Sequence, residues 1–189
     1  GVDIRVMGSG NPGSTNAFRA MGAAFALVVL CIDFLKGFIA VKFVPFLELG
    51  SIITTTKIDP ELLHIVCGIG VVLGHVYPLY YRFQGGKGLA TMAGVLAALF
   101  PIYLIIGFSI WLLVLIFSGY VGLSTIIAVI TFPIYTHIFY LPGIYSPYGF
   151  FSVMITIFLI YTHRGNIHKM MHGNENQFKK IMLFRRKKL

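Results

Sequence analysis

Residues 89–118 read LATMAGVLAALFPIYLIIGFSIWLLVLIFS and contain no charged side chain. As one helix this run would be about 45 Å long at about 1.5 Å per residue, more than the roughly 30 Å of a hydrocarbon core. Pro101 lies inside the run, and proline ends or kinks a helix because it removes a hydrogen bond. The run is therefore either one kinked membrane span or two short spans, 89–100 and 102–118.

The composition of the whole chain indicates a membrane protein. Of its 189 residues, 57% are hydrophobic and 11% are charged, whereas an ordinary soluble domain has about 25% charged residues. In such a chain, long apolar runs predict transmembrane helices. Besides the run around Pro101, we expect spans at residues 20–44, 62–81, 121–140 and 149–162.

The distribution of basic residues decides between one span and two, because Lys and Arg collect on the cytoplasmic side of a membrane. Basic residues lie before the first span, after the second span and in the tail, residues 163–189. Two spans within residues 89–118 place all three basic regions on one side, whereas one span would place the tail on the other. The net charge of +9 is therefore interpreted as an orientation signal and not as a sign of nucleic-acid binding.

These patterns predict an all-α integral membrane protein. We expect a polytopic helical bundle with about six transmembrane segments, in one domain covering residues 1–189. The tail from residue 163 would be cytoplasmic.

A first polar stretch, GSGNPGSTN at residues 8–16, comes directly before the first span. Small residues let backbone N–H groups approach an anion, and a helix N-terminus is a ready phosphate site. Ser14, Thr15 and Asn16 suit the N-cap, and we expect Arg19 in the first helical turn, where it would add a two-pronged phosphate contact. A flexible cytoplasmic loop explains this stretch alone equally well.

A second polar stretch, GHVYPLYYRFQGGKGLAT at residues 74–91, combines a glycine turn, the cation Lys87 and an expected helix start. It does not match the nucleotide-binding pattern G-x-x-x-x-G-K-[ST], because Gly88 follows the lysine. His75 is interpreted as a packed or interfacial histidine. Within the first span, Asp33 and Lys36 are spaced to pair, and a structural pair is favoured over a proton relay.

A third polar stretch, HRGNIHKMMHGNE at residues 163–175, follows the last span. On a helix, His163 and Asn166 would share one face, with Lys169 close by. The alternative is a basic amphipathic segment on anionic lipid, and we prefer that interpretation for the part of the tail from Lys179 onward.

In order and spacing, the three polar stretches resemble the three motifs of the bacterial membrane acyl-phosphate:glycerol-3-phosphate acyltransferases, the PlsY family. The resemblance covers essentially the whole chain. The sequence departs from the usual motifs at Gln84 (usually Lys), Lys169 (usually Arg) and Asn174 (usually Thr). Family members also have a transmembrane helix before the first motif, which would make seven segments.

The resemblance implies transfer of an acyl group from acyl phosphate to the 1-hydroxyl of glycerol 3-phosphate, giving lysophosphatidic acid and phosphate. It implies no coenzyme A, carrier protein, metal or other cofactor. The expected partners are these two substrates and membrane lipid, with no nucleic acid and no obligate protein partner. The expected location is the bacterial cytoplasmic (inner) membrane, with the active site on the cytoplasmic side.

The resemblance also implies roles for individual residues. The expected catalytic residues are Ser9, Lys87, His163 and Asn166. The expected substrate-binding residues are Gly8, Gly10, Asn11, Gly13, Thr15, Asn16, Arg19, Gly85, Gly86 and Gly88. Lys87, Ser9 and the glycine N–H groups would hold the acyl-phosphate head group, and Arg19 and His163 would act on glycerol 3-phosphate.

Two questions stay open at this point. The general base is either His163 or the departing phosphate of the substrate, although the lack of a paired nucleophile and base favours direct transfer without an acyl-enzyme. A membrane transporter or binding protein for an anionic, phosphate-bearing solute is the alternative function, because transporters also place cations at helix N-termini.

Overall fold

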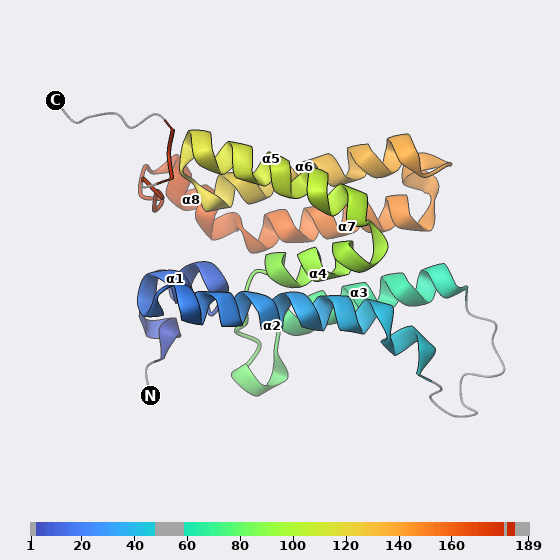
Figure 1. Cartoon of the computed structure of the whole chain (residues 1–189), viewed down its shortest axis with the longest axis horizontal. Coiled ribbons are helices and arrows are strands. Elements are labelled where there is room, and N and C mark those ends of the chain that lie inside the picture. The colour runs from blue at the N-terminus through green and yellow to red at the C-terminus, as the bar shows by residue number, and fades with distance from the viewer. Residues whose placement is uncertain (1–2, 48–58, 180, 184–189) are drawn as a thin grey trace. The chain divides into compact units, whose positions relative to one another are not determined.

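The structure is a computed structural model that describes residues 3–47, 59–179 and 181–183. Within these residues every regular element is a helix (Figure 1). The chain divides into two compact units, Gly1–Pro101 and Ile102–Leu189, and each is described here by itself. Most of the basic tail beyond Lys179 lies outside the described residues.

The first unit is organised around one long helix, α2 (Ala23–Lys42), which packs against the unit's other helices (Figure 1). These helices are α1 (Ser14–Met21), α3 (Pro60–Val76) and α4 (Leu89–Leu99). Gly22 separates α1 from α2 with φ of 88°, a left-handed conformation that favours glycine. The predicted span 20–44 therefore begins at Ala23, and a separate short helix precedes it.

Helices α2 and α4 cross with their backbones in direct contact. A Cβ atom on Gly37 would overlap the backbone of Thr91, and one on Gly94 would overlap the backbone of Phe34. Glycines at such a crossing let two apolar helices approach closely, which maximises van der Waals contact where lipid offers no hydrophobic driving force. The crossing fixes α4, and with it the glycine turn before α4, to the middle of α2.

The predicted break at Pro101 is confirmed. Helix α4 ends at Leu99, and α5 (Pro101–Ser118) begins with the proline. Phe100 between them has φ of −136° and ψ of 61°, which is not helical. Proline suits the first position of a helix because its missing N–H would have no helical partner there.

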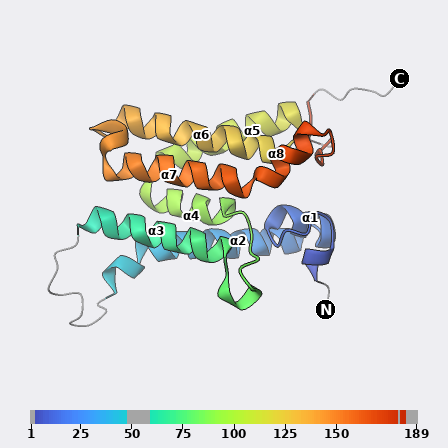
Figure 2. The same cartoon turned by 180° about the vertical axis from the view of Figure 1, so that it is seen from behind.

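The second unit contains the length of α5 beyond Pro101, followed by α6 (Val121–Phe139), α7 (Pro147–Thr162) and α8 (Arg164–Met171), with α7 leading into α8 (Figure 2). Hydroxyl groups connect these helices. Tyr103 donates to the carbonyl of Ala128 over 2.7 Å, and Thr156 donates to the carbonyl of Val129 over 2.9 Å. Because the donors lie in apolar surroundings, such bonds specify which helix faces which.

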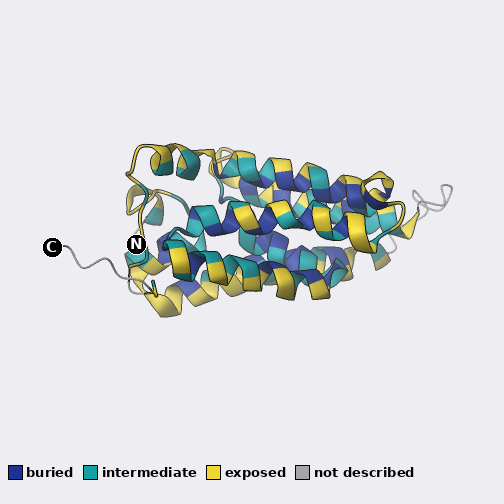
Figure 3. Ribbon diagram, turned by 90° about the horizontal axis from the view of Figure 1, so that it is seen from above, coloured by how far each residue is buried: buried dark blue, intermediate teal, exposed yellow. Residues whose placement is uncertain are grey.

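The helices agree with the six predicted segments to within a few residues. Four are long and apolar enough to cross a membrane, at Ala23–Phe46, Pro60–Tyr81, Pro101–Ser118 and Val121–Phe139, whereas α4 and α7 are apolar but shorter. Large apolar side chains remain exposed along the helices (Figure 3), for example Ile102 at 64% and Ile105 at 69% on α5. A lipid environment accounts for apolar surface of this kind.

The glycine crossing predicts a stability difference between two similar substitutions. Gly94→Ala should lower the free energy of unfolding by about 1–3 kcal/mol, because the new methyl group overlaps the α2 backbone. The thermal midpoint in detergent should then fall by several degrees. Gly70→Ala on α3 is the control, because a Cβ there meets no atom within 4 Å, and alanine favours a helix more than glycine does. Equal midpoints for the two variants would contradict the crossing.

Candidate functional site

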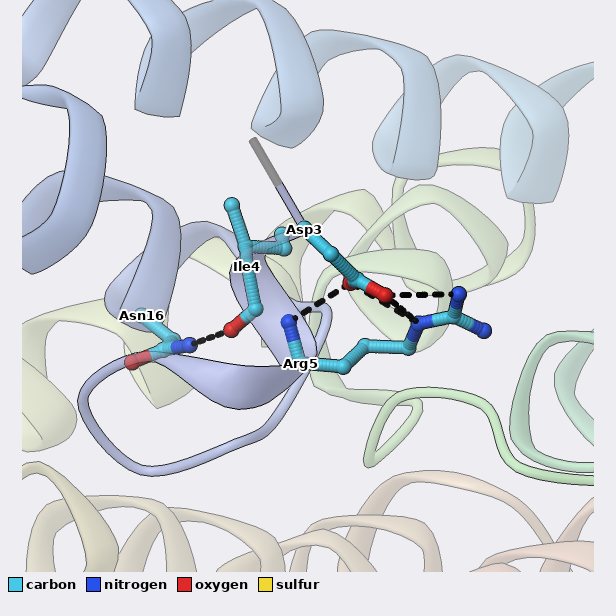
Figure 4. A network of polar contacts seen from close by, with 4 residues as sticks. All are labelled: Asp3, Ile4, Arg5 and Asn16. Atoms are coloured by element: carbon cyan, nitrogen blue, oxygen red, sulfur yellow. Dashed lines mark hydrogen bonds and ion pairs between the residues drawn. The ribbon is translucent and has the colours of Figure 1, made fainter. Parts of the chain in front are cut away.

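Asn16 organises the first polar stretch (Figure 4). Asn16 is 1% exposed. Its Nδ2 donates to the carbonyl of Ile4 over 2.8 Å, the bond drawn in Figure 4, and to the carbonyl of Met7 over 3.0 Å. Its Oδ1 accepts from the Ser9 N–H over 2.8 Å. Gly8 has φ of 59° and lies so close that a Cβ would overlap Oδ1 of Asn16. Asn16, expected to bind substrate, therefore uses its amide to shape the loop.

The first polar stretch uses several of its own N–H groups. Ser9 donates to Asn16, Gly10 to the carbonyl of Met7, and Gly13 to the side chain of Asn11 over 2.9 Å. These three N–H groups therefore bond within the loop, and their part in substrate binding stays a prediction. Ser9 is exposed, and Ser14 and Thr15 in the first turn of α1 are half-buried.

Two expectations about the helix after this stretch are wrong. Gly13 is the N-cap of α1, without a side-chain hydrogen bond, and Ser14 is already the first helical residue. Arg19 lies in the last turn of α1, because Gly22 ends that helix soon afterwards. The first-turn N–H groups and the backbone of Arg19 thus lie in opposite turns of a short helix.

Arg5, just before the first polar stretch, contacts the second stretch. Its guanidinium pairs with Asp3 over 2.9 Å and lies over the ring of Tyr81, 5.1 Å from the ring centroid. The hydrogen bonds from Arg5 lower the pKa of the Asp3 carboxyl below its usual value. Tyr81 belongs to the turn that leads into the glycines before Lys87, so the segment before the first polar stretch reaches this turn within the first unit.

The glycines of the second polar stretch close the end of α3. Gly85 donates its N–H to the carbonyl of Val76 over 3.0 Å, and Gly86 donates to the carbonyl of His75 over 3.2 Å. The last carbonyls of a helix have no partner within it, so these two bonds satisfy them. The N–H groups of Gly85 and Gly86 therefore bond to α3, and their expected role as phosphate ligands stays a prediction.

The polar groups best suited to an anion come after these glycines. Gly88 has φ of 87° and is the N-cap of α4, so the N–H groups of the first turn of α4 have no partner within the helix. Lys87 precedes this cap and is half-buried. A helix N-terminus beside an ammonium group attracts phosphate by its partial positive charge and by direct hydrogen bonds.

A charged cluster lies behind the glycine turn. Lys36 contacts Asp33 over 2.5 Å and Nδ1 of His75 over 2.6 Å, and Nδ1 of His75 is 3.2 Å from Asp33. The predicted pair of Asp33 and Lys36 is therefore confirmed, with a third member from α3. His75 is packed, as predicted, with a side chain that is 9% exposed.

His163 joins α7 to α8 in the second unit. It is the C-cap of α7 and the N-cap of α8, and it is buried. Its Nδ1 is 2.8 Å from the carbonyl of Leu159. Because a carbonyl only accepts, Nδ1 carries the proton, and Nε2 is the basic nitrogen of the neutral ring.

Asn166 has a partner that the sequence analysis missed. Its N–H donates to the carbonyl of His163 over 2.9 Å, and its Nδ2 donates to Oε1 of Glu175 over 2.9 Å. Oε2 of Glu175 is buried and has no hydrogen-bond partner among the described residues. One sequence signal pointed to this carboxylate, because Glu175 is the single acidic residue of the tail.

The predicted site residues fall into two groups. Ser9, Arg19 and Lys87 belong to the first unit, whereas His163 and Asn166 are neighbours in the second. In each unit, a close contact at a glycine positions the backbone near these residues. In the second unit, a Cβ on Gly122 of α6 would lie 2.7 Å from Cβ of Asn166, so the glycine allows α8 to approach α6.

Comparison with known proteins agrees with this geometry. The family model described as glycerol-3-phosphate acyltransferase matches residues 1–173. The chain belongs to this family. The matched range contains Ser9, Arg19, Lys87, His163 and Asn166, and it ends two residues before Glu175.

Individual members of the glycerol-3-phosphate acyltransferase family match over most of their length. One from Chlorobium phaeobacteroides is 35% identical over 202 residues, covering 95% of this chain and 86% of the relative. One from Aquifex aeolicus is 36% identical over 178 residues, covering 94% and 86%. The expected family is therefore confirmed.

Two crystal structures of PlsY, an integral membrane glycerol 3-phosphate acyltransferase, have the same fold. The glycerol 3-phosphate form superimposes with a TM-score of 0.78 at 35% identity, covering 94% of this chain and 83% of that one. The lysophosphatidic acid form gives a TM-score of 0.75 at 34% identity, covering 90% and 81%. This family member is thus an all-α integral membrane protein, as predicted.

The role of Asn16 leads to a prediction about the first loop of this acyltransferase. Asn16→Ala should release the Ser9 N–H and two carbonyls, at about 1–3 kcal/mol for each buried group left unpaired. Amide hydrogen exchange at Ser9 should then become at least about tenfold faster. Asn11→Ala is the control, because it removes only the bond to Gly13 and should leave Ser9 protected. Unchanged exchange at Ser9 in Asn16→Ala would contradict this role.

Proposed function

We propose that this chain transfers a fatty acyl group from acyl phosphate to the 1-hydroxyl of glycerol 3-phosphate. The products are 1-acyl-glycerol 3-phosphate, which is lysophosphatidic acid, and inorganic phosphate. The observation that carries this proposal is the family match over residues 1–173. The position of Lys87 next to the N-terminus of α4 supports the proposal chemically, because both substrates carry a phosphate group that a positive charge attracts.

The proposed reaction is a single transfer. The glycerol 3-phosphate hydroxyl oxygen attacks the acyl carbonyl carbon, and the carbon–oxygen bond to phosphate breaks. The hydroxyl proton leaves with the phosphate or passes to Nε2 of His163. Lys87 and the first N–H groups of α4 stabilise the charge that develops on the departing phosphate, by preorganised electrostatics.

The other proposed roles follow the local geometry of each residue. The Ser9 hydroxyl donates to the acyl-phosphate head group from a loop shaped by Asn16. Arg19 binds the phosphate of glycerol 3-phosphate, and Asn166 orients that substrate. Glu175 fixes the direction of the Asn166 amide, because a carboxylate oxygen accepts only and must face Nδ2.

We further propose that residues 1–189 act as one acyltransferase domain in the cytoplasmic (inner) membrane of a bacterium. The active site would face the cytoplasm, where the basic loops are expected by the distribution of Lys and Arg. The substrates and membrane lipid would be its partners, without an obligate protein partner.

Turnover in detergent tests the activity. Purified protein given acyl phosphate and glycerol 3-phosphate should release phosphate and form lysophosphatidic acid in equal amounts. Omitting glycerol 3-phosphate should abolish phosphate release if the reaction is a transfer. Release at an unchanged rate without the acceptor would indicate hydrolysis, and no release would favour a transporter, which needs a sealed membrane to act.

Removal of the Lys87 ammonium should affect the chemical step. Lys87→Ala should lower kcat by about 100- to 1,000-fold, the usual effect of losing one preorganised electrostatic group. Lys42→Ala is the control, because Lys42 is an exposed cation in the last turn of α2. Steady-state kinetics and the thermal midpoint should be measured for both variants. Wild-type kcat in Lys87→Ala would rule out the proposed role.

Removal of the Arg19 guanidinium should act mainly on substrate affinity. Loss of one charge-assisted contact costs about 1.5–3 kcal/mol, so KM for glycerol 3-phosphate should rise roughly 10- to 150-fold in Arg19→Ala. KM for acyl phosphate should change less, because burial of the acyl chain contributes about 0.8 kcal/mol per methylene independently. Varying each substrate in turn measures both constants. The opposite pattern would mean that Arg19 binds the acyl-phosphate head group.

A further inference from the structure

His75 contacts the glycine turn in two ways. Its carbonyl accepts from the Gly86 N–H over 3.2 Å. Its ring lies against the α-carbon of Gly86, so that a Cβ there would overlap Nε2. One residue at the end of α3 therefore holds the backbone of Gly86 from both the main chain and the side chain.

The opposite edge of the His75 ring is held by charge. Lys36 lies 2.6 Å from Nδ1, and the Asp33 carboxylate lies 3.2 Å from the same atom. Both residues come from α2, the helix that also fixes α4 through Gly37 and Gly94. With Nδ1 anchored, the ring plane is set and Nε2 is directed at Gly86.

We propose that His75 is a positioning residue, anchored by Asp33 and Lys36, that sets the backbone of residues 85–88. Through this backbone it determines where the Lys87 ammonium and the first N–H groups of α4 point. This inference rests on the proposed function. It gives the cluster of Asp33, Lys36 and His75 a part in the reaction, in addition to its structural role of joining α2 to α3.

The physical reason is the short path from Gly86 to the charge. Lys87 is the next residue, and Gly88 after it caps α4. A displacement of about 1 Å at Gly86 passes directly to the ammonium group, and a misplacement of that size lowers a rate by up to about 100-fold. An apolar side chain in place of His75 would fill the space without fixing a ring direction.

A double-mutant cycle tests the contact between the ring and the glycine. Gly86→Ala should lower kcat/KM by at least roughly tenfold, because its methyl group meets the ring. His75→Asn keeps a polar atom near the place of Nδ1 but removes the ring edge, and it should also lower kcat/KM. In the double variant the methyl group fits the vacated space, so the two losses should not multiply.

Gly85→Ala provides the matched control. Its Cβ would overlap the backbone carbonyls of His75 and Val76, which His75→Asn leaves in place. The losses from Gly85→Ala and His75→Asn should therefore multiply. The thermal midpoint is measured for every variant, and His75→Gln replaces His75→Asn if the latter does not fold.

The outcomes separate this inference from the proposed function. Coupling in kcat/KM for Gly86 but not for Gly85 supports the positioning role. In an active protein, either of two results overturns it: losses in kcat/KM from Gly86→Ala and His75→Asn that multiply, or coupling in the thermal midpoint without coupling in kcat/KM. A wild-type protein without turnover overturns the proposed function itself, and the positioning role with it.

Discussion

The backbone contact between α2 and α4 is the constraint on which the first unit depends. Gly37 and Gly94 allow it, because any side chain at either position would overlap the other helix. Helix α4 has only 11 residues, about 16 Å at about 1.5 Å per residue. Such a short helix gains its position from packing rather than from its own length. The N-terminus of α4, next to Lys87, is therefore positioned by Gly37 and Gly94 at the helix crossing, away from the lysine itself.

In the loops of the first unit, hydrogen bonds within the protein already occupy several backbone polar groups. The Asn16 side chain bonds to the backbone of Ile4, Met7 and Ser9, and Gly85 and Gly86 bond to the last carbonyls of α3. Buried polar groups without partners are costly, so these bonds make the loops rigid. What remains for a ligand is a small set of side chains and the first turns of α1 and α4. A phosphate would meet preorganised groups and not a flexible loop.

The helices were predictable from sequence, and the loop hydrogen bonds were not. Hydropathy located the apolar helices, and Pro101 marked the break between α4 and α5, because both signals act over a few neighbouring residues. The separate helix α1 depends on a single left-handed glycine, Gly22, which looks like any other small residue in the sequence. The partners of Gly85, Gly86 and Asn166 come from distant or later segments, so residue type and spacing identified the candidate residues without showing which of their groups were already bonded.

The C-terminal segment has a part in the second unit that its basic, tail-like composition conceals. Phe178 donates its N–H to the carbonyl of Gly119 over 2.8 Å, and Leu183 donates to that of Ile116 over 3.1 Å. These bonds hold residues 174–179 and 181–183 against the junction of α5 and α6, and Glu175 accepts a hydrogen bond from Asn166. A chain shortened to the range of the family model, residues 1–173, would lose Glu175 and with it the hydrogen bond that holds the Asn166 side chain. For this protein, the boundary of the family model and the boundary of the folded structure do not coincide.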